Sequence, residues 1–169
     1  GLLVLDWLNN RRTPDANANV TGAIIGLTLH TSPCEVFKAL VEGTAYGSEM
    51  ILKRVRKYDI SVNEMIACGG LSKIPHLMQV YADVHNMPIK VTASSQTCAL
   101  GAAMFGAVAD GAFSDTLQAQ EKMGSGIEAE YKPDPERAGI YKKLFNEYAE
   151  SGKALQPIMI RLSDLKRSI

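Results

Sequence analysis

Three short apolar runs in this chain are each followed by a segment with the signature of a helix. The runs cover residues 22–29, 64–68 and 89–92. Apolar runs of this length, bounded by turn residues, are typical of buried strands. Strands that alternate with helices favour an α/β fold, in which helices cover a layered sheet. The chain has 169 residues, of which 46% are hydrophobic, and this is enough for one domain with a core.

The first run and the helix after it carry the clearest signals. Residues 22–29 are apolar without alternation, which predicts a strand covered on both faces. The sequence Ser-Pro-Cys-Glu at 32–35 has the residues of a capping box, so we expect a helix from there to about Lys57. Gly43 and Gly47 lie one turn apart in this helix. Because a glycine costs about 1 kcal/mol inside a helix, the pair predicts that another part of the chain approaches closely.

The middle of the chain predicts a second strand, a helix and a third strand. After the strand over residues 64–68, Pro75 fits the first turn of a helix that ends at Asn86. A short strand over residues 89–92 follows. The inner face of the helix is predicted to hold Leu77, Met78, Tyr81 and Val84.

The last third of the chain is predicted to be mainly helical. Residues 96–110 are rich in alanine and glycine, so we expect a helix whose small-residue face packs tightly on a neighbour. A connector with some helical content covers residues 111–126. Pro133-Asp134-Pro135 then starts a final helix with Gly152 as its stop. The tail at 156–169 shows little periodicity and is expected to fray.

Charge balance and apolar runs narrow the function classes. The chain has 18 basic and 18 acidic residues, so a nucleic-acid-binding surface is not favoured. No apolar run approaches the roughly 20 residues that a membrane-spanning helix needs. The first residues lack the basic region of a signal peptide. We therefore expect a cytoplasmic protein and, because the chain does not begin with Met, a fragment.

Cysteines and histidines show no metal or disulfide pattern. Cys34, Cys68 and Cys98 form no CxxC pair and are expected to be reduced thiols in the core. The histidines are expected at the surface or at caps, without a ligand role, because they lack metal-ligand spacing. They are His30, His76 and His85.

The pair Gly69-Gly70 allows two interpretations. One is a tight turn that needs a positive φ and binds nothing. The other is a nucleotide site, where glycines let backbone N–H groups approach a nucleoside or phosphate at a helix N-terminus. The run Gly-Gly-Leu-Ser-Lys-Ile does not match the GxGxxG dinucleotide fingerprint, and the chain has no Walker A sequence. On these residues alone, both interpretations stay open.

Three segments in order carry a resemblance to a known family. They are TGAIIGLTLHTSPCEVFKALVEGTAYG, ACGGLSKIPHLMQVYADVHNMPIKV and SSQTCALGAAMFGAVADG. Together they resemble the carboxyl-terminal half of the FGGY-family carbohydrate kinases, which belong to the actin/hexokinase/Hsp70-type ATPases with a ribonuclease H-like fold. The resemblance covers residues 3–155. It implies that residues 1–155 are a carboxyl-terminal nucleotide-binding domain, incomplete at its N-terminal side.

Two segments favour one branch of that family. LDWLNNRRTP and MQVYADVHNMPIKV look most like the bacterial members that phosphorylate ribulose. Members that phosphorylate xylulose, glycerol, gluconate or rhamnulose remain alternatives. So does a non-catalytic module that dimerises or regulates.

The resemblance implies roles for individual residues. Gly69 and Gly70 match the family's adenosine motif, where backbone lies against the nucleoside of ATP. Leu71, Lys73 and Ile74 are then expected to border the adenine and the ribose. Leu71 stands where the family usually has glycine or alanine, which alters this wall of the pocket. The helix at 96–110 matches a family helix near the interdomain hinge.

The resemblance also implies that part of the machinery lies elsewhere. In the family, the catalytic aspartate, most phosphate-binding hairpins and the sugar pocket lie upstream of this segment. We therefore expect ATP and Mg²⁺ as cofactors, but no catalytic residue and no Mg²⁺ ligand in this chain, which alone is expected to be inactive. The sugar is expected to bind mainly to the other domain, and a homodimer stays open. Asp6, Glu42, Asp83 and Asp110 are expected to be structural or solvated.

Overall fold

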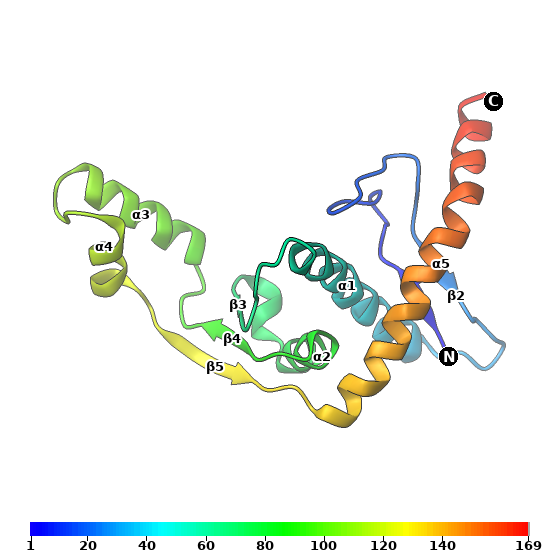
Figure 1. The fold of residues 1–169 in the computed structure, drawn as a ribbon, viewed down its shortest axis with the longest axis horizontal. Helices are drawn as coiled ribbons and strands as arrows, with labels where there is room; N and C mark the ends of the chain where they lie inside the picture. Colours follow the sequence, from blue (N-terminus) through cyan, green and yellow to red (C-terminus); the bar gives the residue numbers. More distant parts are fainter. Residues whose placement is uncertain (169) are drawn as a thin grey trace.

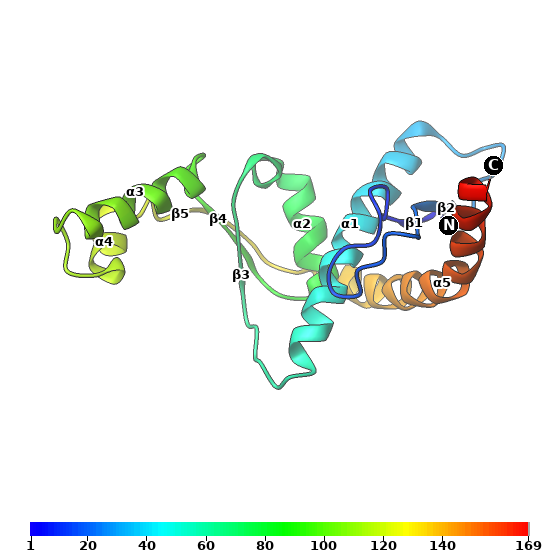
Figure 2. The same ribbon diagram turned by 90° about the horizontal axis from the view of Figure 1, so that it is seen from above.

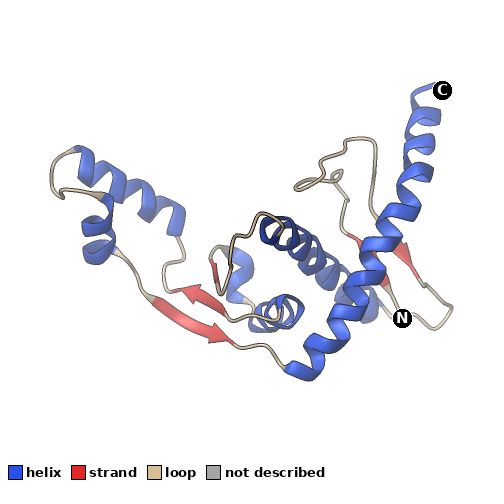
Figure 3. Ribbon diagram, in the orientation of Figure 1, coloured by secondary structure: helices blue, strands red, loops and turns tan. Residues whose placement is uncertain are grey.

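The structure is a computed structural model that describes residues 1–168, and it is elongated (Figure 1). Helices make up most of it, and the strands are short (Figure 3). The elements in chain order are β1 (Leu3–Leu5), β2 (Ala23–Ile25), α1 (Pro33–Arg56), β3 (Met65–Ala67), a 3₁₀ helix (Gly70–Lys73), α2 (Pro75–His85), β4 (Ile89–Thr92), α3 (Thr97–Ala109), α4 (Thr116–Met123), β5 (Ile127–Tyr131) and α5 (Pro135–Ser168).

The strands form two small sheets. β1 and β2 pair antiparallel. In the other sheet, of order β3-β4-β5, the first two strands are parallel and the last two are antiparallel. The helices α1 and α2 lie between these sheets, and α5 runs alongside them past β1 and β2, while α3 and α4 stand at the far end of β4 and β5 (Figure 2). The predicted α/β class, with helices covering a sheet, is confirmed.

The main core lies where β1, α1, α2 and α5 meet. Its aromatic centre is Tyr46 of α1, whose ring lies 5.5 Å from that of Tyr148 and 6.4 Å from that of Phe145, both on α5. A second cluster joins α2 to the three-stranded sheet. It consists of Leu77, Met78, Ala82, Ile89 and Val91.

The predicted start of α1 and its two glycines are confirmed. The Glu35 backbone N–H donates to Ser32 Oγ over 3.3 Å, and the Ser32 N–H donates to Glu35 Oε2 over 2.8 Å, which completes the capping box. A Cβ atom on Gly43 would lie 2.7 Å from the carbonyl oxygen of Val4. One on Gly47 would lie 2.5 Å from a carboxylate oxygen of Asp6. The segment that approaches α1 is therefore β1 and the residue after it.

The predicted helix and strand around residue 86 are also confirmed. Asn86 has a left-handed φ of 49° and ends α2, as the sequence predicts. Leu77, Met78 and Val84 are buried, as the predicted inner face requires. Tyr81 is only partly buried, and its hydroxyl lies 3.0 Å from Thr44 Oγ1.

The predicted strand over residues 22–29 is wrong in length and in burial. Only Ala23–Ile25 pair, and Gly26 ends the strand with a φ of 89°. Leu27 and Leu29 are exposed by 57% and 103%. Ala23 and Ile25 pack against the main core, whereas Ile24 between them is exposed by 42%, so the strand is covered on one face only.

The small-residue face of α3 does not pack as predicted. None of its residues is buried, and a Cβ atom on Gly101 or Gly106 would meet nothing within 4 Å. Ala and Gly content alone therefore misidentified a packed helix. Within residues 1–168, α3 packs chiefly on α4, which is too short to bury it.

The final helix does not stop at Gly152. It continues through Gly152 and Pro157 to Ser168, so residues 156–168 are helical where little regular structure was predicted. Gly152 has a packing reason instead: a Cβ atom there would lie 2.9 Å from the ring of Trp7. Met159, beyond it, is buried in the main core. The domain limit at residue 155 stays a prediction.

The prediction that the cysteines lie in the core is wrong. All three are exposed; they lie in the first turn of α1, directly after β3 and in the first turn of α3. His30 and His76 are exposed, as predicted, but His85 is buried. Its Nδ1 lies 2.7 Å from Glu49 Oε2, so a local sequence reading missed a partner that comes from α1.

Neither a membrane span nor a metal site is found within residues 1–168. None of their helices combines the length and apolarity needed to cross a membrane. They also contain no group of three or more histidine, cysteine or acidic side chains placed to hold a metal ion.

Candidate functional site

The glycine pair lies at the carboxyl-terminal edge of the three-stranded sheet. Because β3 and β4 are parallel, the loops that follow Ala67 and Thr92 leave from the same edge. Ligands of open α/β sheets bind outside the carboxyl ends of the strands. A hollow of about 450 Å³ lies here, next to β5. It is lined by Gly69, Ser72, Lys73, Pro75, residues 91–95, Glu128, Ala129 and Tyr131.

The two glycines differ in conformation. Gly69 has a φ of 91°, in the region that favours glycine. Gly70 has no positive φ. A Cβ atom on either residue would meet no atom within 4 Å. The turn interpretation therefore explains Gly69, whereas neither backbone conformation nor packing among the described residues explains a glycine at position 70.

The turn that carries the glycines is held from within. Ser72 is buried, and its hydroxyl donates to the carbonyl of Gly69 over 2.8 Å. The Ile74 N–H donates to the carbonyl of Leu71 over 3.2 Å. No side chain caps the N-terminus of α2, which begins at Pro75. The N–H groups of its first turn therefore have no side-chain acceptor there and give this end partial positive charge.

A second loop, after β4, forms the opposite wall. Its shape is set by hydroxyl groups: Thr97 Oγ1 donates to the carbonyl of Ser94 over 3.0 Å, and the Ser94 N–H donates to Ser125 Oγ over 3.1 Å. Thr92 Oγ1 lies 3.1 Å from Thr97 Oγ1. This wall was not predicted. The available signal was the polar run Ala-Ser-Ser-Gln-Thr at residues 93–97, directly after the predicted strand over residues 89–92.

The structure brings together only part of the predicted nucleotide site. Gly69 and Lys73 line the hollow. Gly70, Leu71 and Ile74 lie on the same loop but outside this lining. Leu71 and Ile74 are exposed by 62% and 43%, so their apolar side chains lie beside the hollow in contact with solvent.

The carboxylates predicted to be structural lie elsewhere. Asp83 is buried and its Oδ2 lies 3.0 Å from Arg137 Nε. Glu42 accepts a hydrogen bond of 3.0 Å from the hydroxyl of Tyr141. Asp110 follows α3 as its C-cap. None of these residues lines the hollow at the glycine loop.

Asp6 is also outside that hollow. Its Oδ1 accepts a hydrogen bond of 2.6 Å from the hydroxyl of Tyr148. Burial raises the pKa of Asp6 above the ordinary value, and the hydrogen bond from Tyr148 opposes this shift. The same burial, together with the nearby charge of Asp6, raises the pKa of the Tyr148 hydroxyl, so this tyrosine remains a donor at neutral pH.

Comparison with known proteins decides the family. The carboxyl-terminal domain of the FGGY family of carbohydrate kinases matches residues 1–109. The chain belongs to this family. It is 43% identical to a ribulokinase of Geobacillus thermodenitrificans over an alignment of 177 residues. This alignment covers 99% of this chain and 31% of the relative. A ribulokinase of Vibrio parahaemolyticus is 41% identical over 92% of this chain and 28% of its own length. The predicted resemblance to this branch is confirmed.

Solved structures agree with the fold. A xylulose kinase from Lactobacillus acidophilus superposes with a TM-score of 0.81 at 28% identity, over 92% of this chain and 31% of that one. A gluconate kinase from the same organism superposes with a TM-score of 0.80 at 28% identity, over 91% of this chain and 31% of that one. The predicted ribonuclease H-like fold of this family, present as a partial domain, is confirmed. The chain spans about a third of the length of the curated relatives it matches, with 31% covered in the first of them.

Proposed function

We propose that this chain is the nucleotide-binding part of an ATP-dependent sugar kinase whose acceptor is the 5-hydroxyl of L-ribulose. Membership of a carbohydrate kinase family supports the reaction class. The choice of ribulose is supported by relatives, 41–43% identical to the chain, that are ribulokinases.

The observation that carries the nucleotide role is Gly70. It occupies a position where a side chain would be sterically free and conformationally allowed within this chain. A glycine is expected there if something outside the chain needs the space, and a nucleoside lying against the backbone supplies that reason. Leu71 and Ile74 are exposed. An adenine ring lying on them would remove their apolar surface from contact with water, which is favourable.

The residues present therefore fit ATP. In this proposal, the backbone of Gly69 and Gly70 holds the nucleoside, and Lys73 adds a positive charge at the edge of the hollow. The free N–H groups at the start of α2 favour a negative group nearby. When bound, ATP supplies the phosphoryl group. This part of the chain binds and orients the nucleotide and shields one face of it from water.

Mg²⁺ and the general base belong, in this proposal, to the rest of the protein. Phosphoryl transfer depends on in-line positioning and on charge neutralisation by metal ions, and a base must reach the acceptor hydroxyl. The carboxylates of this chain named above are engaged in pairs or lie away from the glycine loop. We therefore expect the chain alone to release no ADP when L-ribulose and Mg·ATP are added in a coupled assay. Ribulose-dependent release of ADP by the chain alone would contradict this assignment.

Substituting Gly70 tests the nucleotide role in the full-length protein. Gly70→Val introduces a branched side chain into the space assigned to the nucleoside, so we expect ADP affinity to fall by about tenfold or more, the equivalent of about 1.4 kcal/mol. Calorimetric titration measures this affinity. The unfolding midpoint should be unchanged, because, apart from its two neighbours in sequence, none of the described residues has an atom within 4 Å of the new Cβ atom.

Gly139→Val is the matched control. Gly139 also has open space around its Cβ position, but it lies on α5, outside the hollow. ADP affinity should remain at the wild-type level in this variant. Unchanged affinity in a folded Gly70→Val protein would return the glycine pair to the turn interpretation. ATP binding without ribulose-dependent turnover in the full-length protein would favour a non-catalytic module.

A further inference from the structure

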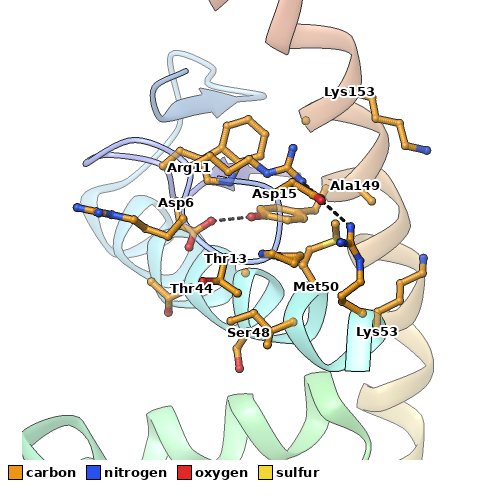
Figure 4. Close-up of a pocket in the computed structure, with 18 of the residues that line it drawn as sticks. Asp6, Arg11, Thr13, Asp15, Thr44, Ser48, Met50, Lys53, Ala149 and Lys153 are labelled. Atoms are coloured by element: carbon orange, nitrogen blue, oxygen red, sulfur yellow. Dashed lines mark hydrogen bonds and ion pairs between the residues drawn. The ribbon is translucent and has the colours of Figure 1, made fainter. Parts of the chain in front are cut away.

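A second and larger hollow, of about 670 Å³, lies between residues 10–15, α1 and α5 (Figure 4). It shares no lining residue with the hollow at the glycine loop. Its size falls within the range of about 300–1,000 Å³ that is usual for small-molecule sites. The proposed nucleotide role does not use it.

One wall of this hollow is fixed by two glycines. Gly47 leaves room for the carboxylate of Asp6, which would otherwise lie 2.5 Å from a Cβ atom. Gly152 leaves room for the ring of Trp7, which would lie 2.9 Å from a Cβ atom at position 152. The guanidinium of Arg11 lies over that ring, 4.9 Å from its centroid. A cation over the face of tryptophan is electrostatically favourable, so Arg11 is held in place.

Two arginines in this hollow share one carboxylate. Arg11 Nη2 lies 2.8 Å from Asp15 Oδ2, and Arg54 Nη2 lies 2.5 Å from Asp15 Oδ1. Arg11 and Asp15 are labelled in Figure 4. A guanidinium has five N–H donors, so one shared carboxylate leaves most donors of Arg54 unused. Paired, preorganised guanidinium groups suit the oxygen atoms of a phosphate.

The hollow also concentrates positive charge in a chain whose net charge is zero. Glu150 and Asp15 are already in ion pairs. Within residues 1–168, Lys53 and Lys57 form no ion pair, although Lys53 Nζ lies 5.3 Å from the ring centroid of Phe145. The basic residues that line the hollow outnumber the acidic ones. The basic residues are Arg11, Arg12, Lys53, Arg54, Lys57 and Lys153, and the acidic ones are Asp6, Asp15 and Glu150.

We propose that this hollow binds a small phosphate monoester whose remaining part carries hydroxyl groups. A phosphate monoester has a charge of about −1.5 to −2 at neutral pH, which the unpaired cations Lys53 and Lys57 and the spare donors of Arg54 balance. Asn10 and Ser48 line the same hollow and provide neutral donors and acceptors for hydroxyl groups. A simple anion would leave these groups unused.

Lysine protection in the full-length protein tests the proposal. Glycerol 2-phosphate is the probe, and glycerol is the uncharged comparison. With millimolar probe, acetylation of Lys53 and Lys57, read by mass spectrometry, should slow severalfold. Lys142 and Lys143, which are exposed on α5 outside the hollow, should react as before. Glycerol should protect none of the four. Absence of protection at Lys53 and Lys57 would overturn the proposal.

Charge-matched variants separate a site from general attraction. The double substitution Lys53→Gln and Lys57→Gln should weaken binding of glycerol 2-phosphate by about fivefold or more, because two charge-assisted contacts are lost. Replacing Lys142 and Lys143 by glutamine removes the same charge and should leave affinity unchanged. An equal loss in both variants would mean non-specific attraction and refute the site. If Gly70→Val abolished binding of glycerol 2-phosphate, the phosphate would bind at the glycine loop instead, and this result would also refute the site.

Discussion

Gly43 offers the sharpest test of the packing of this domain, because two known effects oppose each other there. In a helix, Gly→Ala is favoured by about 1 kcal/mol. In this structure the new Cβ atom would lie 2.7 Å from the carbonyl oxygen of Val4 and 3.3 Å from its Cβ. That oxygen belongs to backbone that is paired with β2 through Ile24, so it cannot rotate away as a side chain would. Overpacking of this kind costs about 1–3 kcal/mol, and we expect a net loss of about 1 kcal/mol.

Gly139→Ala is the matched control, since the same chemical change is made in open space. There, only the helix preference remains, and the variant should be stabilised by about 0.5–1 kcal/mol. Hydrogen exchange in the full-length protein, read by mass spectrometry on peptides from β1, α1 and α5, measures both effects. Exchange should accelerate in β1 and α1 for Gly43→Ala and slow in α5 for Gly139→Ala. Slower exchange in both variants would show that β1 does not press on α1 and refute the reasoning.

Two further predictions concern the carboxylates of Asp6, which is partly buried, and Glu42, which is buried. Because burial raises the pKa of Asp6, this group favours folding below its unfolded pKa, and that contribution is lost as the pH rises through the raised folded value. The variant Asp6→Asn keeps an acceptor for Tyr148 but does not ionise, so the unfolding free energy of the variant relative to wild type should increase with pH above about 4. Chemical denaturation of both proteins at several pH values measures this difference. A difference that stays constant with pH would contradict the prediction. Tyr141→Phe removes the donor to buried Glu42 and should cost about 1–3 kcal/mol, whereas an unchanged denaturation midpoint would mean that water replaces the hydroxyl.

Elements with their own local stop and start signals could be predicted from the sequence. The capping box at Ser32 and the left-handed position of Asn86 act through neighbouring backbone atoms, so the residues that form them are adjacent in sequence. Gly43 and Gly47 gave a weaker but correct signal that something approaches α1. The sequence did not identify the partner, because β1 lies some 40 residues away and carries no turn signal of its own.

Elements whose state depends on tertiary contacts were misjudged. Gly152 resembles a helix stop locally, yet the ring of Trp7 explains the glycine and the helix continues. β5 was missed although Ile127, Ala129 and Tyr131 alternate with glutamates, a pattern with the period of a strand. In the structure, Ala129 and Tyr131 pack against the second core cluster. A stricter count of alternation would have found this strand.

The candidate site divides in the same way. Its glycine loop was predicted, because the glycines are adjacent and the family resemblance gave them a role. The loop at residues 92–97 was missed, because its part in the hollow depends on β4 being parallel to β3, which the sequence pattern did not fix. Glu128 was missed for a similar reason, since it enters the lining only through the antiparallel pairing of β5 with β4.

The position of α5 is set by polar contacts with three different elements. The hydroxyl of Tyr148 donates to Asp6 after β1, the hydroxyl of Tyr141 donates to Glu42 of α1, and Arg137 pairs with Asp83 of α2. The α5 partners are at positions 137, 141 and 148, and at 3.6 residues per turn these positions share one face.

This arrangement restricts how α5 can dock. Asp83 and Glu42 are buried, so rotation or sliding of the helix by one residue would leave each of these carboxylates without its partner on α5. Lys38 Nζ, 3.7 Å from Glu42, and Gln79, which donates to Asp83 over 2.9 Å, would stay in place. Taking one partner from a buried carboxylate is still unfavourable, whereas an intact buried polar pair adds little to stability compared with apolar packing. The three contacts are therefore better explained as setting the register of α5 than as stabilising the fold. The helix α5 supplies one wall of the cationic hollow, and it follows β5, which lines the glycine-loop hollow. The register of α5 therefore also fixes the geometry of the proposed phosphate site.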